Sequence, residues 1–246
     1  MTVKTPRFLL ILTALFFLGA AVSAMPVVAD DLLNLRELYK NNTFLLWNGH
    51  ESGGGEPVGA AFYWNVRSRD SRGGIERSFF LSAGHIMKGR LIRGPNSDVT
   101  YRIPKVLFRI NKSDLAPDFL VGTLTEYRSN PTYFKKLSRD LKAGEHVFTA
   151  STNPEWGKKI ELQRMRLIED RGNILSFQAE FPSQDGMSGL PVVTREGELV
   201  GIYVGDSEDN PLVVYVMPMR EVIKIYRFVG GDMEELAPSK PNSHTH

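Results

Sequence analysis

A succession of short, strand-like segments between residues 58 and 217 limits the folds open to this chain more than any other feature. The segments are rich in β-branched, aromatic and aliphatic residues, and glycine, proline, asparagine or aspartate stands in nearly every gap. Many short strands separated by turn residues predict an all-β sandwich or barrel. The segments cover residues 58–66, 78–83, 106–110, 119–124, 146–150, 160–168, 174–180, 190–193, 199–204 and 213–217.

The strand pattern pauses over residues 125–142, which indicates a division into two β units. The first unit would cover residues 42–128, and the second would cover residues 129–230 and include a terminal helix. A chain of 246 residues is long enough to bury a core in each unit. Helices are predicted at residues 132–141 and 220–228.

The N-terminus is typical of a secretory signal peptide. Lys4 and Arg7 supply a positive start, and an apolar run follows over residues 8–22. Val-Ser-Ala at residues 22–24 offers small residues at the usual cleavage spacing, so residues 1–24 are predicted to be removed. A short uncleaved anchor is the alternative, but the run is shorter than the roughly 20 residues that span a bilayer.

The segments next to the two ends carry less information. Residues 27–29, Val-Val-Ala, offer a second cleavage site, and residues 25–41 form an N-terminal segment or a propeptide. The proline-containing tail at residues 231–246 is predicted to be disordered. We therefore expect an exported bacterial protein, periplasmic or secreted, without stable membrane association after signal cleavage.

Composition excludes several classes of function. Without Lys4 and Arg7, 28 basic residues face 28 acidic residues, so no nucleic-acid partner is expected. The chain has no cysteine, which excludes disulfides, cysteine nucleophiles and thiolate metal sites. Only three of the five histidines, His50, His85 and His146, lie in the body of the chain, so we expect neither a metal nor a cofactor.

The strongest chemical motif is Asp-Gly-Met-Ser-Gly-Leu-Pro over residues 185–191. A nucleophilic serine must project from a tight turn whose backbone N–H groups point at the reacting carbonyl group. Glycine two positions earlier allows the amides of Gly186 and Ser188 to converge on an oxyanion. Glycine after the serine leaves room for a substrate chain. A hairpin turn with an idle serine is the alternative explanation.

A histidine and an aspartate complete the candidate set. His85 follows the apolar run Phe-Phe-Leu-Ser-Ala-Gly, whose small residues would let a general base approach its serine. Asp118 opens an apolar strand, and its carboxylate can hold the histidine tautomer. Asp114 is a rival, although Pro117 breaks the strand that would follow it. A packing role for the histidine and a strand-capping role for the aspartate are the alternatives.

Together these motifs resemble those of trypsin-like serine peptidases. The Leu-Ser-Ala-Gly-His run that ends at His85 is similar to the family's Thr-Ala-Ala-His, and residues 186–189 are similar to its Gly-Asp/Asn-Ser-Gly. The order His, Asp, Ser is the chymotrypsin order. The resemblance spans about residues 42–228 and is closest to the cysteine-free bacterial branch, which includes glutamyl endopeptidases and the protease domains of periplasmic quality-control proteases. Three further segments resemble that branch, at residues 141–147, 198–202 and 214–218.

The resemblance implies two six-stranded antiparallel β-barrels of the chymotrypsin type with a C-terminal helix. It implies a serine endopeptidase that acts on proteins or peptides, with Ser188 as nucleophile, His85 as base and Asp118 as its partner. The amides of Gly186 and Ser188 would form the oxyanion hole. The substrate pocket would be lined by Phe181, Pro182, Ser183, Gln184, Tyr203, Val204 and Gly205.

Several residues depart from the family pattern. Met187 stands where the family has Asp or Asn, and no Ile-Val-x-Gly activation sequence is present. Tyr203 stands where glutamyl endopeptidases carry histidine, and no acid lies at the predicted pocket base, so cleavage after a hydrophobic or small residue is expected. A catalytically silent trypsin-like fold that acts as a binding module is the alternative. An α/β-hydrolase would need a histidine after the serine, and only His244 and His246 follow it.

Overall fold

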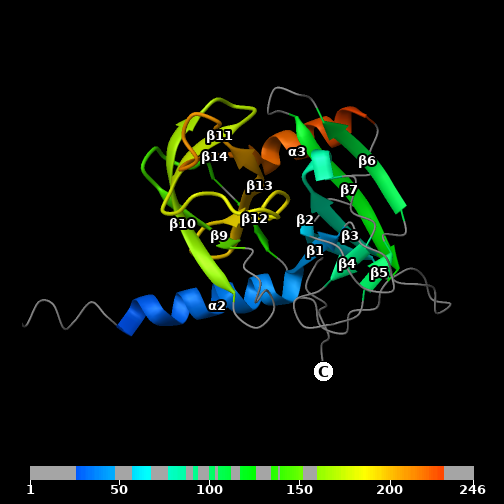
Figure 1. The fold of residues 1–246 in the computed structure, drawn as a ribbon, viewed down its shortest axis with the longest axis horizontal. Helices are drawn as coiled ribbons and strands as arrows, with labels where there is room; N and C mark the ends of the chain where they lie inside the picture. The colour runs from blue at the N-terminus through cyan, green and yellow to red at the C-terminus, as the bar shows by residue number, and fades with distance from the viewer. Residues whose placement is uncertain are drawn as a thin grey trace, which may run out of the picture.

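The computed structural model describes residues 26–47, 57–67, 77–86, 91–93, 100–102, 105–111, 117–125, 134–137, 139–151 and 160–229. Within these ranges the chain forms two mainly antiparallel β-sheets that lie side by side, with a helix on each of two opposite sides (Figure 1). The predicted signal peptide and the predicted disordered tail lie outside the described residues.

The first sheet has the strand order β5-β4-β1-β2-β3-β7-β6. Its edge strands β5 and β6 are only two residues apart in the chain, so the facing ends of the two edges lie within about 11 Å. Phe44 packs edge-on against Phe80 inside this sheet, with ring centroids 5.6 Å apart. The strands are β1 (Thr43–Trp47), β2 (Pro57–Arg67), β3 (Arg77–Ser82), β4 (Leu91–Arg93), β5 (Thr100–Arg102), β6 (Lys105–Asn111) and β7 (Asp118–Thr125).

The second sheet closes into a six-stranded barrel because β12 pairs with both β9 and β13. A seventh strand, β8, adds to β13 in parallel. Along β10, Gln163, Met165 and Leu167 point into the barrel and alternate with outward residues, as expected for a strand with one buried face. The strands are β8 (Lys135–Lys136), β9 (His146–Ser151), β10 (Glu161–Asp170), β11 (Leu175–Ala179), β12 (Pro191–Val193), β13 (Glu198–Asp206) and β14 (Val213–Pro218).

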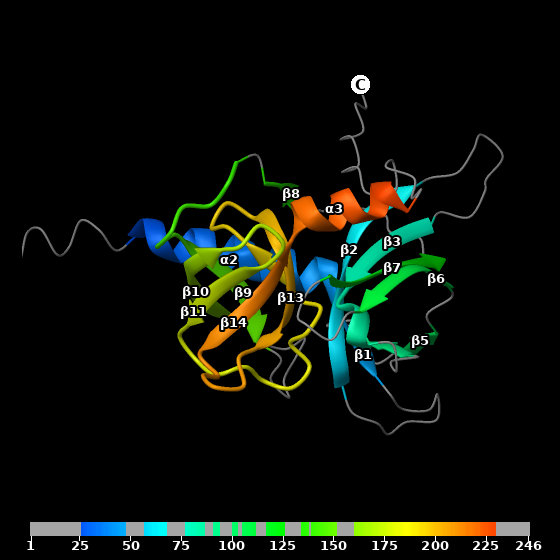
Figure 2. The same cartoon turned by 90° about the horizontal axis from the view of Figure 1, so that it is seen from above.

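Helix α3 (Met219–Phe228) directly follows β14 and crosses from the second sheet toward the first (Figures 1 and 2). Met219, Val222 and Tyr226 are its buried residues, and their spacing places them on one helix face. The Tyr226 ring lies 5.8 Å from that of Phe108 on β6, so the helix packs against the first sheet as well.

Helix α2 (Pro26–Asn42) lies on the side opposite α3 and leads directly into β1 (Figure 1). Leu35 and Tyr39, four residues apart on one face, are buried. The Tyr39 hydroxyl lies 2.7 Å from the Pro191 carbonyl oxygen and 2.9 Å from that of Phe148, so it donates into the seam between β9 and β12. Burial raises the pKa of this hydroxyl above its ordinary value. The last turns of α2 therefore belong to the folded core.

The fold class predicted from the sequence is confirmed: the protein is mostly β, with two sheets, a closed barrel and a C-terminal helix. The predicted helix at residues 220–228 corresponds to α3. The helix predicted at residues 132–141 is wrong, because Lys135 and Lys136 pair instead with Glu198 and Leu199 of β13. Backbone pairing to a distant strand overrides the local preference there.

Candidate active site

His85 lies immediately beyond β3, in a single 3-10 turn over Gly84–Ile86. The end of β3 is fixed by Ser82, whose buried hydroxyl donates a 2.6 Å hydrogen bond to the Ala60 carbonyl of β2. The His85 side chain is 39% exposed, so part of the ring is open to solvent.

Asp118, the first residue of β7, holds His85 through both carboxylate oxygens. Its Oδ1 accepts a 2.9 Å hydrogen bond from the His85 backbone N–H, and its Oδ2 lies 2.5 Å from His85 Nδ1. The carboxylate is buried, with a side-chain exposure of 6%. In the neutral imidazole this pairing favours the proton on Nδ1 and leaves Nε2 as a proton acceptor. Asp114, the rival acid, lies outside the described residues.

The close approach of Asp118 to His85 requires glycine at position 84. A Cβ atom there would overlap the Ile110 carbonyl oxygen and lie 2.8 Å from Asp118 Oδ1. Arg109 Nε donates a 2.7 Å hydrogen bond to the Gly84 carbonyl and further fixes the turn. The glycine that replaces the family's alanine is thus a consequence of tight packing.

Ser188 lies on a turn between β11 and β12, and the buried side chain of Met187 stabilises this turn. The Met187 side chain is only 2% exposed, and its Sδ accepts a 3.3 Å hydrogen bond from the Gln184 amide. The Met187 amide donates to the Gln184 carbonyl at 3.2 Å, and the Leu190 amide donates to the Met187 carbonyl at 3.0 Å. The residue that departs from the family pattern is therefore an apolar anchor of the turn.

The same turn is clamped between the two sheets. The Ala60 amide of β2 donates to the Ser188 carbonyl at 2.7 Å, and the Gly189 amide donates to the Tyr203 carbonyl of β13 at 2.7 Å. Gly189 has φ of +91°, and a Cβ there would overlap the Ala60 carbonyl oxygen. Only glycine allows this left-handed backbone to approach β2 so closely.

Ala60 connects the histidine and serine segments. Its carbonyl accepts from Ser82, three residues before His85, while its amide donates to the Ser188 carbonyl. The Asp118 amide donates to Met217 Sδ of β14 at 3.4 Å, which joins the first sheet to the second at the same junction. The segments that carry the three predicted triad residues therefore meet at the junction of the two sheets.

Two backbone amides at the Ser188 turn, those of Gly186 and Ser188, belong to the predicted oxyanion hole. Gly186 has φ of +87°, and neither its amide nor that of Ser188 donates to a backbone acceptor among the described residues. Backbone N–H groups that have no internal acceptor are what stabilises a developing negative charge.

The predicted pocket residues differ in exposure. Tyr203 is 1% exposed and Val204 is 7% exposed, whereas Phe181 is 61% exposed. The Tyr203 hydroxyl is in short contact with the Ser183 hydroxyl, so the two predicted walls touch each other. Burial raises the pKa of Tyr203 to about 12, which keeps its hydroxyl protonated near neutral pH.

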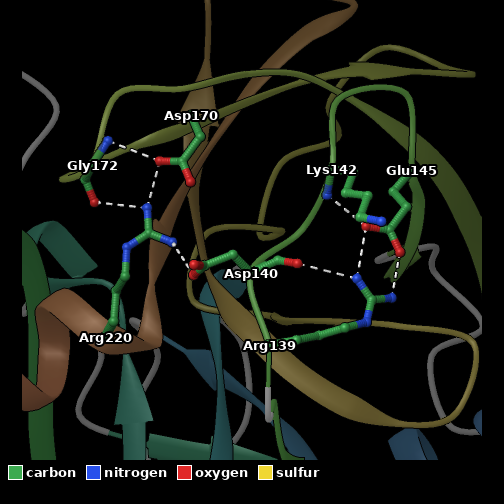
Figure 3. Close-up of polar contacts among 7 residues, drawn as sticks. All are labelled: Arg139, Asp140, Lys142, Glu145, Asp170, Gly172 and Arg220. Carbon is green, nitrogen blue, oxygen red and sulfur yellow. Dashed lines mark hydrogen bonds and ion pairs between the residues drawn. The ribbon is translucent and has the colours of Figure 1, made fainter.

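An ion-pair network that the sequence reasoning missed joins α3 to the loops of the second sheet (Figure 3). Arg220 pairs with Asp170 at the end of β10 and lies 3.7 Å from Asp140. Arg139 pairs with Glu145, and this hydrogen bond lowers the pKa of Glu145 to about 2. The alternating charges over residues 139–145 are the only sequence signal of this network.

The described residues contain no group of three or more His, Cys, Asp or Glu side chains that could hold a metal ion. Among them, neither helix combines the length and the apolar character required to cross a bilayer.

Comparison with known proteins establishes the fold. No family model matches the chain, and no curated protein matches it. The active form of the Rv3671c protease of M. tuberculosis is similar with a TM-score of 0.55 and 15% identity, over 87% of this chain and 87% of that one. Its inactive form gives 0.54 and 14% identity, over 84% and 96%. The serine endoprotease of Yersinia pestis gives 0.54 and 14%, over 78% and 65%. The chain thus has the fold of chymotrypsin-like serine proteases.

Proposed function

We propose that this protein is a serine endopeptidase that hydrolyses peptide bonds through a Ser-His-Asp triad and an acyl-enzyme. The observation that carries the proposal is the pair of hydrogen bonds that Asp118 accepts from the backbone and ring of His85, at a junction that also holds the turn of Ser188. The fold shared with the solved serine proteases supports the same reaction class.

In the acylation step, Ser188 Oγ attacks the carbonyl carbon of the scissile peptide bond, and His85 Nε2 takes the hydroxyl proton. Asp118 stabilises the imidazolium that forms. The carbonyl oxygen becomes an oxyanion that accepts hydrogen bonds from the Gly186 and Ser188 amides. The C–N bond then breaks, and His85 gives its proton to the leaving amine. The acyl group remains as an ester on Ser188.

In the deacylation step, a water molecule takes the place of the amine. His85 removes a proton from this water while the water oxygen attacks the ester carbonyl carbon. The Gly186 and Ser188 amides stabilise the second oxyanion. When the ester bond breaks, the proton passes from His85 to Ser188 Oγ. The free carboxylic acid leaves, and the enzyme returns to its starting state.

The proposal includes export. Its support is the N-terminal sequence: two basic residues, an apolar run over residues 8–22 and small residues at 22–24. We expect the protein recovered outside the cytoplasm to begin near residue 25. Mass spectrometry of its N-terminus tests this, and an intact N-terminus in an exported fraction would contradict it.

A fluorophosphonate probe tests the catalytic proposal, because it reacts covalently only with an activated serine. The purified protein is incubated with the probe, and the modified residue is mapped by mass spectrometry. We expect labelling at Ser188 that Ser188→Ala and His85→Ala abolish. Ser176→Ala is the matched control, since it changes a serine whose buried hydroxyl has no hydrogen-bond partner among the described residues. No labelling of a folded protein would contradict the proposal and favour a silent fold used for binding.

A further inference from the structure

Tyr203 lies next to the Ser188 turn and contacts it through its backbone and its side chain. Its backbone pairs directly with the turn: its carbonyl accepts from the Gly189 amide at 2.7 Å, and its amide donates to the Leu190 carbonyl at 2.9 Å. Its hydroxyl contacts the hydroxyl of Ser183, five residues before Ser188. The ring therefore extends from β13 to the segment that leads into the serine turn.

The exposed fractions of these side chains indicate how deep the predicted substrate pocket beside the Ser188 turn can be. Tyr203 is only 1% exposed, so almost none of its ring can be reached by solvent. A pocket deep enough for a leucine, phenylalanine or lysine side chain would leave part of that ring accessible. Ser183 is half-buried and Phe181 is 61% exposed, so the rim stays open above a filled floor.

Charge at the floor disfavours an anionic substrate side chain. Burial raises the pKa of the Tyr203 hydroxyl most, and the negative charge of Asp206, at the exposed end of β13, raises this pKa further. The carboxylate of a substrate side chain that approached the Tyr203 hydroxyl would be repelled by the negative charge of Asp206. It would also have to displace the Ser183 hydroxyl from its contact with Tyr203. Desolvating a carboxylate without a cationic partner is costly.

We infer that Tyr203 fills the floor of the substrate pocket, so that the enzyme cleaves after residues with small side chains such as alanine. This inference rests on the proposed function and assigns its specificity to one side chain. A larger side chain would have to displace a packed ring, and protein interiors are too dense to accept such a group without rearrangement.

A peptide series tests the inference. Fluorogenic peptides identical except for Ala, Leu, Phe, Glu or Lys before the cleaved bond are compared by kcat/KM. We expect wild type to favour Ala over each of the others by about tenfold or more. A wild-type preference for any of the larger side chains would overturn the inference.

The variant Tyr203→Val removes the ring and places a β-branched residue, which suits a strand, on β13. We expect kcat/KM for the Leu and Phe peptides, relative to the Ala peptide, to rise about tenfold or more. Tyr226→Val is the matched control, because it removes the same atoms from a buried tyrosine on α3 and should leave the ratio unchanged. An unchanged ratio in a folded Tyr203→Val protein would overturn the inference.

Probe labelling separates failure of the inference from failure of the proposed function. Labelling at Ser188 with the wrong peptide profile refutes the role of Tyr203 and leaves the peptidase reaction standing. Absence of labelling in folded wild type refutes both. If Tyr203→Val does not fold, the wild-type profile alone still decides the inference.

Discussion

Replacing Tyr39 by phenylalanine removes one hydroxyl group from the junction between α2 and the closed barrel. That hydroxyl is buried and lies within hydrogen-bond distance of the Phe148 and Pro191 carbonyl oxygens. Pro191 keeps a second donor, the Thr149 hydroxyl at 3.0 Å, so the main loss falls on Phe148. One lost hydrogen bond with a partly unsatisfied buried carbonyl costs about 1–2 kcal/mol of the free energy of unfolding.

Urea denaturation and thermal unfolding measure this cost. For a chain of this size we expect the midpoint temperature to fall by roughly 2–8 °C. Tyr39→Ala, which also removes the ring that packs edge-on against Phe134, should cost about 3–5 kcal/mol. Tyr215→Phe is the control, because that hydroxyl makes no hydrogen bond to another described residue. It should change stability by less than about 0.5 kcal/mol.

The result decides the role of residues 25–41, for which the sequence leaves a propeptide open. A protein that begins at Thr43 lacks Tyr39, and we expect it to be less stable than Tyr39→Ala or not to fold. A stable, probe-reactive protein that begins at Thr43, together with no effect of Tyr39→Phe, would refute the structural role of α2.

Three further predictions address the site and the ion-pair network. Asp118→Asn should lower kcat by about 10⁴-fold, the size of this change in the Ser-His-Asp template, without loss of strand signal in circular dichroism. An unchanged kcat would contradict this prediction. Gly189→Ala should lower the free energy of unfolding, measured in urea, by more than about 2 kcal/mol. Gly144 has a similar φ, but a Cβ added there would meet no atom within 4 Å, so Gly144→Ala should cost about 1 kcal/mol. Equal costs would contradict the close approach of Gly189 to β2. The hydrogen bond from Arg139 lowers the pKa of Glu145 from 4.5 to about 2, so the stabilisation by this ion pair is present above about pH 4.5 and is lost as the pH falls toward 2. The difference in urea midpoint between wild type and Glu145→Gln should therefore shrink over that pH range. A constant difference would contradict this prediction.

The strands were predictable because their residues carry local patterns. The segments 58–66 and 160–168 correspond to β2 and β10, whose apolar and turn residues mark their own limits. Strands β4 and β5 have three residues each, too few to show a pattern. Helix α2 was missed because its apolar residues follow closely on the signal-like run, and residues 27–29 also fit a cleavage site.

For the candidate site, the sequence allowed the residues to be predicted but not the contacts that connect them. Asp118 could be chosen over Asp114 because Pro117 interrupts the strand that would follow the latter. The link through Ala60, which connects Ser82 to Ser188, joins residues more than 100 positions apart and leaves no local trace. The contact between Ser183 and Tyr203 is likewise invisible until β13 is placed beside the serine turn.

The hydrogen bond from Tyr39 to Pro191 joins residues 152 positions apart, and it has a consequence for the timing of folding. Synthesis at about 5–20 residues per second separates their appearance by roughly 8–30 s. During that interval the last turn of α2 lacks its acceptor, and the barrel lacks the strand that closes it. A chain exported as proposed would remain unfolded for this time, with its export segment leading, and would complete its core only after β12 has arrived.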